Sequence, residues 1–503
     1  MVRAEGRPRL IAILLAAVLG VALAVTVAET KTGSAAVFVA AAPFAVLLML
    51  ARPDLGTYAI IFMAPFVDVF KTTTMGITLR LNEVCGVVLC FLVILNMLRS
   101  KQRWRPGRLD LFILGLMGSM LVSIIANIGN LPSEEALRQV PTAWIGVEGI
   151  LDTPAMATWK RMVQAVVAFA AYFVVSNQLA TREAWRRAAA VLVVSSMLVC
   201  AWSLLNLLGF LAGMKSGLGI TPGNIWFTGG APRITGTLSE PSYFANYLLV
   251  VIPMVFFCYA RGTVLVGRRW DLAALVLLCA TLFFTFSGGG WTVFAFEALL
   301  MLAICARHRV PMGKLARMLL ALAICGSLGL LAAALFTDMD YGKLAADNWR
   351  KLAEVFSSGV GSGRRVVPDV GWMMFADHPL FGVGPGRFRV FEYAYLVRLG
   401  YTDDLPSSSF YASMLGELGV LGMVMVAGIF ASLTALCFRR ARLAGQALTR
   451  SLLWGMGVAV AAMAVHYLAH ATLWWPYVWI VFGLAAAGGR LARENAAMEE
   501  QQT

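Results

Sequence analysis

The sequence predicts an all-α, polytopic integral membrane protein with about 14 transmembrane helices and one long structured outer loop. Of its 503 residues, 60% are hydrophobic and only 14% are charged. The mean hydropathy is +0.77. Apolar runs of about 16 to 25 residues recur from Leu10 to Ala487, the length that a helix needs to cross a ~30 Å hydrocarbon core. This composition excludes a soluble enzyme, a nucleic-acid binder and a disulfide scaffold.

The first run is expected to be a retained span, because the arginines before it lead into Glu29 and Lys31 without a convincing cleavage site. The chain is then a single membrane domain, 1–503, with spans 1 to 11 in 10–336, a large periplasmic loop at 337–408, spans 12 to 14 in 409–489 and a cytoplasmic tail at 490–503. The expected spans are 10–27, 34–50, 55–70, 83–98, 109–126, 159–178, 188–211, 242–260, 271–286, 291–305, 317–336, 409–437, 451–473 and 477–489.

The distribution of charge predicts the orientation. The net charge is +14, and 25 of the 41 lysines and arginines lie in connectors on the side of the N-terminus. Cytoplasmic connectors carry such an excess of basic residues. We therefore expect both termini in the cytoplasm and the three long connectors, 127–158, 212–241 and 337–408, outside. The basic balance is a topology signal.

The loop at 337–408 is expected to carry structure. Leu344, Leu352 and Phe356 fall at helical spacing among charged residues, which predicts an amphipathic helix lying on the outer membrane surface. Two glycine-rich turns are followed at once by arginines, at 359–365 and 382–389. Glycine backbone N–H groups and guanidinium groups together suit a pyrophosphate. The alternative is two flexible turns with solvated arginines.

A second polar cluster, 232–244, precedes the span at 242–260. Ser239 or Ser242 is expected to cap that helix, and Glu240 and Pro241 suit its first turn. This explanation leaves Arg233 without a role. A glutamate beside a helix start at the membrane surface also fits a base or a ligand of a sugar hydroxyl.

These segments together resemble the O-antigen polymerase and ligase superfamily of bacterial envelopes. The resemblance rests on Arg233 to Phe244, on Gly363-Arg364, on Asp377 to Phe388 and on Gly416 to Gly422, which follow one another in the family's order and on the same side of the membrane. The motif-bearing part covers residues 233–422, and the span count and late outer loop extend the similarity over the whole chain.

The resemblance implies a metal-independent, multi-span glycosyltransferase that needs no cofactor. It would take a glycan from undecaprenyl pyrophosphate at the outer face of the inner membrane and pass it to a sugar hydroxyl. The family's pyrophosphate-binding arginines correspond here to Arg233, and to Arg364 or Arg365 with Arg387 or Arg389. Tyr243 and Tyr411 complete the expected substrate-binding set. Glu240, Asp377 and His378 are the candidates for a catalytic base.

The chain departs from the family pattern at two places. Ligases of the family have a histidine just before the span with the Glu-Leu-Gly motif, and this chain has Ser408 there. Many relatives have an arginine in a Ser-Arg-Gly turn where this chain reads Ser287-Gly288-Gly289-Gly290. The first departure favours a polymerase of O-antigen or exopolysaccharide repeat units over a ligase that acts on lipid A core. The second puts one anion contact in doubt.

Several other features have alternative explanations. His466 and His470 share a helix face and make an incomplete metal site, so they are either a packed pair or part of a cavity lining. Asp338-Met339-Asp340 is interpreted as a solvated loop start. Glu297 is an ionisable group at membrane depth and hence a functional candidate. Trp474, Trp475, Tyr477 and Trp479 are expected to form an interfacial aromatic belt, although such rings also stack on sugars. The eight cysteines are expected to be buried and unpaired.

A lipid or polysaccharide transporter is the alternative from another functional class. Against it, no internal repeat is evident, and the polar residues collect on one face. The expected partners are an undecaprenyl-pyrophosphate-linked oligosaccharide, membrane lipid and a chain-length regulator protein, with no nucleic acid.

Overall fold

The computed structural model describes residues 53–66, 71–74, 77–80, 90–91, 93–95, 97–98, 105–129, 153–211, 226–228, 231–310, 313, 346, 363–399 and 409–502. The first two expected spans, the span at 317–336, the amphipathic helix at 344–356 except residue 346, Asp338 to Asp340 and Ser408 lie outside these residues. The described part confirms the predicted all-α membrane fold.

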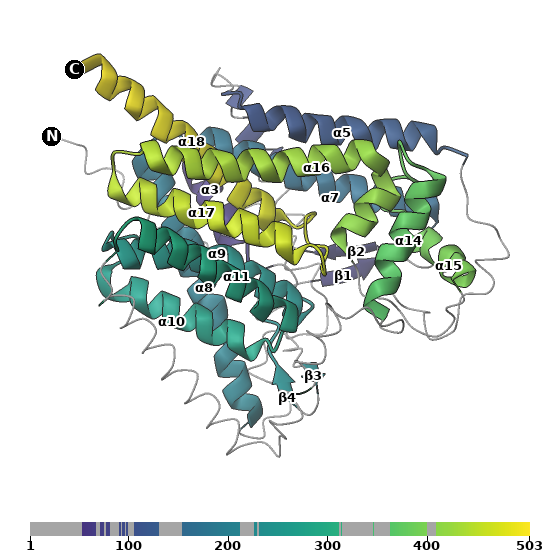
Figure 1. The fold of residues 1–503 in the computed structure, drawn as a ribbon, viewed down its shortest axis with the longest axis horizontal. Helices are drawn as coiled ribbons and strands as arrows, with labels where there is room; N and C mark the ends of the chain where they lie inside the picture. The colour runs from purple at the N-terminus through teal and green to yellow at the C-terminus, as the bar shows by residue number, and fades with distance from the viewer. Residues whose placement is uncertain are drawn as a thin grey trace.

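Helices dominate the described chain, and two short antiparallel hairpins accompany them (Figure 1). The helices are α3 (Pro53–Phe62), α5 (Arg108–Ala126), α7 (Pro154–Gln178), α8 (Arg182–Leu211), α9 (Pro241–Arg261), α10 (Arg268–Phe284), α11 (Gly288–Arg307), α14 (Gly363–Asp377), α15 (Phe388–Arg398), α16 (Phe410–Leu443), α17 (Ala447–His466) and α18 (Pro476–Gln502). The hairpins pair β1 (Lys71–Thr74) with β2 (Ile77–Arg80) and β3 (Trp226–Thr228) with β4 (Ala231–Arg233).

Hydropathy located the long helices well. Six of the described helices, α5, α8, α9, α11, α16 and α17, are long and apolar enough to cross a membrane. Together with α7, α10 and α18 they coincide with the spans expected between 109 and 305 and between 409 and 489. α18 continues beyond the last expected span, without a break, to Gln502, so the expected tail at 490–503 is largely helical.

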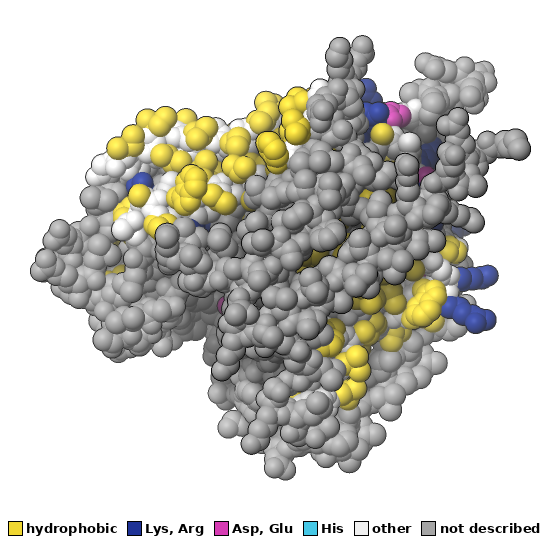
Figure 2. Space-filling view, turned by 180° about the vertical axis from the view of Figure 1, so that it is seen from behind, with side chains coloured by type: hydrophobic (Ala, Val, Ile, Leu, Met, Phe, Trp, Pro, Cys, Tyr) yellow, Lys and Arg dark blue, Asp and Glu magenta, His cyan; other side chains and the backbone are white. Residues whose placement is uncertain are grey.

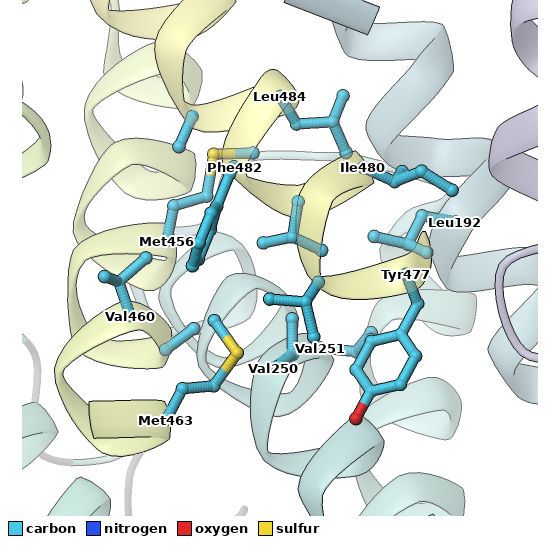
Figure 3. Packing of buried hydrophobic residues seen from close by; sticks show 14 of the residues in the cluster. Leu192, Val250, Val251, Met456, Val460, Met463, Tyr477, Ile480, Phe482 and Leu484 are labelled. Atoms are coloured by element: carbon cyan, nitrogen blue, oxygen red, sulfur yellow. The ribbon is translucent and has the colours of Figure 1, made fainter. Parts of the chain in front are cut away.

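The core forms around α9, which is apolar on all sides and almost wholly buried. It packs against α17, α10 and α11, while α18 packs against α7 and α16 lies between α17 and α5. Figure 3 shows the interdigitated side chains of α8, α9, α17 and α18, among them Leu192, Val251, Met463 and Phe482. A helix that is hydrophobic all round is stable only inside such a bundle.

The outer helices leave large apolar side chains exposed, as a lipid environment requires. Leu111, Ile125, Trp159 and Leu299 are all more than 60% exposed. Figure 2 shows hydrophobic side chains spread over the described surface, whereas Lys and Arg side chains project mainly at its right-hand edge, the end that carries the C-terminus. Which end faces the cytoplasm stays a prediction from the charge of the connectors.

We call the opposite end of the bundle the outer end. It is formed by the C-termini of α5 and α17 and the N-termini of α7, α9, α11 and α16. Two helices that the sequence analysis did not anticipate, α14 and α15, lie there in the second half of the long loop (Figure 1). Of the eight cysteines, the six described ones are unpaired, and all but the partly buried Cys279 are buried, as predicted.

Candidate active site

The second glycine-rich turn of the loop pairs with the start of α16. Val383 donates its backbone N–H to the Gly416 carbonyl at 2.8 Å, and Gly384 donates to the Glu417 carbonyl at 3.0 Å. On the other side of the turn, Val420 N–H reaches the Pro379 carbonyl at 2.9 Å. Two of the four segments on which the family resemblance rests, Asp377 to Phe388 and Gly416 to Gly422, therefore pair through their backbones.

Positive φ angles make this pairing dependent on glycine. Gly382 has φ +63°, and a Cβ there would lie 2.3 Å from the Glu417 carbonyl carbon. Gly419 has φ +61° and interrupts α16. The backbone of Pro379 and Leu380, from the loop, passes directly against it. No side chain fits either position without moving the backbone.

Glu417 occupies the anion position that the sequence analysis assigned to a pyrophosphate. Its carboxylate is 1% exposed and accepts backbone hydrogen bonds from Gly386 N at 2.9 Å and Phe388 N at 3.4 Å. The expected pyrophosphate contact of the turn at 382–389 therefore stays a prediction, although two of its amides already have an acceptor. Its amides hold a carboxylate of the protein itself.

Arg387 is buried and ties three elements together. Its Nε donates to Thr158 Oγ1 at 2.9 Å and its terminal nitrogen donates to the Asn127 carbonyl at 2.8 Å. Asn127 Nδ2 in turn donates to the Gly382 carbonyl at 2.9 Å. Burial lowers the pKa of the Arg387 guanidinium, although it remains charged at neutral pH. The geometry gives Arg387 a role in joining α5, α7 and the turn.

Arg161, near the start of α7, is a candidate functional residue that the sequence analysis missed. Its guanidinium lies over the Trp474 ring, 5.1 Å from the centroid, and one terminal nitrogen is 3.6 Å from Glu417 Oε1. Its side chain is 23% exposed, and its buried Nε has no acceptor among the described residues. The available signal was an arginine a few residues inside an expected span, which calls for a partner.

The start of α9 forms the other wall of the site. Arg233, at the end of β4, donates from Nε to the Thr285 carbonyl at 3.0 Å. Glu240 is the N-cap of α9, with Pro241 following as the first helical residue, and its Oε2 accepts from Ser242 Oγ at 3.0 Å. The expected serine cap was wrong, because the capping position is Glu240 itself. Its carboxylate is only partly buried.

The segment from His470 to Trp475 connects the two walls. Trp474 lies under Arg161, while the Trp475 ring meets the Tyr243 ring at 5.1 Å. The expected aromatic belt was wrong. Trp474, Tyr477 and Trp479 are at most 5% exposed, and Trp479 Nε1 donates to the Leu473 carbonyl. These three rings pack inside the bundle, whereas Trp475 is partly buried.

The remaining predicted residues have partners within the protein or lie outside the described side chains. Asp377 accepts from Tyr395 and Arg398, each at 2.9 Å. Although partial burial raises the pKa of Asp377, these hydrogen bonds and the Arg398 charge outweigh it and hold that pKa below its usual value. Arg389 is paired with the buried Glu392 at 2.7 Å.

Tyr411 donates its hydroxyl to the Ala464 carbonyl at 2.6 Å. His378 is half-buried, and its carbonyl accepts from Gly382 N–H. Arg364 and Arg365 belong to the first turn of α14 instead of a loop turn, and their side chains are outside the described part. Ser287-Gly288-Gly289-Gly290 likewise starts a helix, with Ser287 Oγ accepting from Gly290 N–H.

An apolar hollow of about 250 Å³ lies between α5 and α7, on the inner side of Arg161. Its walls include Ile113, Met117, Val166, Phe169 and Phe173, and its lining is almost entirely apolar. Phe169 also contacts Trp474, with ring centroids 6.4 Å apart. The hollow therefore follows α7 away from the Arg161–Trp474 pair, and exposed lining residues such as Leu114 and Val166 open it to the outside of the bundle.

Within the described residues, no three His, Cys, Asp or Glu side chains are grouped as metal ligands. Glu297 is fully buried on α11, and both its carboxylate oxygens lack a partner in the described part of the chain. It remains an ionisable residue inside a span with no assigned role.

Comparison with known proteins agrees with the resemblance found in the sequence. Residues 273–427 match the sequence model of the O-antigen ligase family. The matched segment begins in α10 and ends in α16, so it includes the turn at 382–387 and its partner at Glu417. A search among curated proteins gave no match. The chain therefore contains a region typical of membrane enzymes of the O-antigen ligase and polymerase type.

Proposed function

We propose, from the O-antigen ligase-like region and the geometry of the outer end, that this protein polymerises oligosaccharide repeat units carried on undecaprenyl pyrophosphate. In this proposal the protein lies in a bacterial inner membrane with both termini in the cytoplasm and the outer end in the periplasm. The donor's diphosphate is the leaving group, and an acceptor sugar hydroxyl attacks the anomeric carbon.

The observation that carries the proposal is the position of Arg161. It is a partly exposed guanidinium at the outer end of the bundle, in contact with Trp474 and Glu417, with a buried nitrogen that has no acceptor among the described residues. A planar guanidinium binds phosphate oxygens with two hydrogen bonds. Its single carboxylate contact, at 3.6 Å, is longer than a good charge-assisted hydrogen bond, so a diphosphate would be the better ligand.

Other groups at the outer end support the same chemistry. Arg233 ends β4, a few residues before α9, and is partly exposed, and Arg364 and Arg365 belong to the first turn of α14. Because a diphosphate is already an activated leaving group, the protein mainly has to neutralise its charge and position the acceptor. The half-buried Glu240 carboxylate is placed to accept a hydrogen bond from a sugar hydroxyl.

The isoprenoid chain of the donor also has a matching surface. The apolar hollow between α5 and α7 starts about 8 Å below Arg161, taking a rise of ~1.5 Å per residue from Arg161 to Val166. A lipid tail in that hollow would leave the diphosphate at the level of Arg161. We therefore place the donor along α7.

A ligase is the second candidate, because the family match fits both reactions. The absence of the ligase histidine at Ser408 favours the polymerase. A lipid or polysaccharide transporter remains the alternative outside the enzymes. The three differ in what becomes of a lipid-linked repeat unit.

The test uses purified protein with its lipid-linked repeat unit in detergent, without added metal, and with lipid A core offered in a parallel reaction. A polymerase gives a ladder of longer lipid-linked products. Product found only on lipid A core would replace the polymerase with a ligase. No product in either reaction, together with repeat units trapped in the inner leaflet of cells lacking the protein, would indicate a transporter.

A further inference from the structure

Basic side chains from four helix ends meet at the end of the bundle opposite the outer end. There α9 ends at Arg261, and α11 ends at Arg307, which His308 follows as the C-cap. α16 ends one residue after Arg442, and α17 has Arg450 near its start. These four helices pack against one another, which brings residues that are far apart in the sequence together. We call these five residues the basic cluster.

A buried indole holds two members of the basic cluster. The Arg261 guanidinium carbon lies 4.8 Å from the centroid of a Trp454 ring. The His308 ring lies against the same side chain, with centroids 4.2 Å apart and planes inclined by 40°. Trp454 itself is only 2% exposed. Because a cation is attracted by the face of an indole, Trp454 fixes the position of Arg261.

The guanidinium groups of the cluster are fixed but not fully hydrogen-bonded. Arg450 donates from Nε and from a terminal nitrogen to the Ala444 carbonyl, at 3.1 and 2.6 Å, at the turn between α16 and α17. The buried Nε of Arg261, by contrast, has no hydrogen-bond partner in the described part of the chain. A buried donor without an acceptor is costly, so an oxygen acceptor from another molecule would stabilise Arg261.

No carboxylate neutralises the basic cluster among the described residues, since none of their ion pairs includes one of its members. The acid at the start of α10, Asp271, is occupied by the backbone N–H groups of Leu265 and Val266, each at 3.0 Å. Partial burial and the charges of the four arginines of the cluster lower the pKa of His308. The four guanidinium groups are therefore close enough to act on one imidazole.

This arrangement differs from an ordinary excess of basic residues on one side of a membrane. Arg268 and Arg269 at the start of α10 are of the ordinary kind, because both are exposed to solvent. In the basic cluster, like charges from separate helices are held close to one another, where they repel. An anion bound between them would remove this repulsion.

Exposed apolar side chains extend from the cluster along the spans. Leu299 and Leu302 on α11 are exposed and lie within about two turns before Arg307. On α16, the exposed Leu443 directly follows Arg442. A molecule with both a phosphate and acyl chains would match the cations and these apolar surfaces together. A soluble anion would match only the cations.

We propose that the basic cluster binds the phosphate of an anionic phospholipid in the leaflet on the side of the C-terminus, with the acyl chains along α11 and α16. Arginine donates paired hydrogen bonds to phosphate oxygens, and basic pockets between membrane spans bind such headgroups. The site lies at the opposite end of the bundle from the proposed glycosyl transfer and does not depend on it.

Native mass spectrometry of the purified protein in detergent tests this site by counting bound lipids in titrations with phosphatidylglycerol and phosphatidylcholine. We expect the wild type to bind phosphatidylglycerol at least about tenfold more tightly. Arg261→Gln and Arg307→Gln should each raise its Kd about fivefold, and the double variant about 20-fold. Arg268→Gln is the matched control, because it removes an exposed arginine at the same end, and it should bind like the wild type.

Three results would overturn the proposal. Two of them are equal Kd values for the two lipids and equal Kd values for the wild type and the double variant. The third is release of phosphatidylglycerol by a tenfold excess of glycerol phosphate, which would assign the cluster to a soluble phosphate.

The single variant Arg307→Gln keeps the test valid if Arg261→Gln does not fold. Arg307 is exposed and has no hydrogen bond or ion pair in the described part of the chain, so its replacement should leave the Tm in detergent unchanged. Because no arm of the experiment uses glycosyl transfer, an inactive wild type would reject the proposed function without affecting this result.

Discussion

At the scale of single residues, the contacts of the buried Glu417 carboxylate explain the Glu-Leu-Gly motif better than ligand binding does. It lies between two backbone amides and Arg161, so removing it leaves buried donors without an acceptor. The sequence placed Glu417 in a recognisable motif but could not reveal its partners, because they come from the loop turn and from α7. Arg161 was missed for the same reason, since its importance depends on Trp474 and Glu417, which are more than 250 residues away in sequence.

We expect Glu417→Ala to destabilise the protein by about 2 to 4 kcal/mol, the usual cost of leaving buried donors and a partly buried charge unpaired. Thermal unfolding in detergent measures it. Glu183→Ala is the control, because Glu183 pairs with Arg186 and Arg187 on an exposed helix start and should leave the Tm unchanged. Equal Tm values for the wild type and Glu417→Ala would show that the contacts of Glu417 are dispensable.

At the scale of elements, hydropathy predicted the spans because each long helix must bury or present an apolar surface along its whole length. It could not predict α14 and α15, whose stability comes from packing against the start of α16 and each other. It also misassigned the aromatic rings from Trp474 to Trp479, because aromatic residues at an expected membrane boundary give the same sequence pattern whether they face lipid or the bundle.

Replacing Gly382 should disrupt the docking of the whole turn at 382–387. In Gly382→Ala, the alanine would have to adopt a left-handed backbone conformation, and its Cβ would lie 2.3 Å from the Glu417 backbone. The loop must therefore detach, or the start of α16 must shift. We expect faster proteolysis between α14 and α16 and a lower Tm. Gly118→Ala on α5 is the matched control, since nothing lies within 4 Å of its added Cβ. Identical proteolysis rates in both variants would contradict the docking of this turn.

At the scale of the whole molecule, the two ends of the helix bundle carry different groups. Basic side chains gather mainly at the end with the C-terminus (Figure 2), and the turn at 382–387 with its partner on α16, the stacked rings of His466 and His470 and the aromatic rings lie at the other. The charge pattern predicts which end is outside, and the fold brings residues from 127 to 475 together there. The sequence could indicate the side of the membrane, but not which of its many arginines meet.

This orientation is testable with single cysteines and a membrane-impermeant maleimide. Asp369→Cys on α14 should be labelled in intact spheroplasts, because Asp369 is exposed at the outer end. Glu183→Cys at the start of α8 should be labelled only after permeabilisation. Unmodified protein provides the blank, since its described cysteines are unpaired and mostly buried. The reverse labelling pattern would place the candidate site in the cytoplasm and contradict the proposal.

The most direct measurement of the central claim is the affinity of purified protein for undecaprenyl pyrophosphate, compared between the wild type, Arg161→Ala and Arg187→Ala. Arg187 is an exposed arginine at the opposite end of the bundle. If Arg161 holds the diphosphate, its removal should raise Kd at least about 30-fold, corresponding to ~2 kcal/mol for a lost charge-assisted hydrogen bond, while Arg187→Ala binds like the wild type. Equal Kd values for all three proteins would contradict the claim.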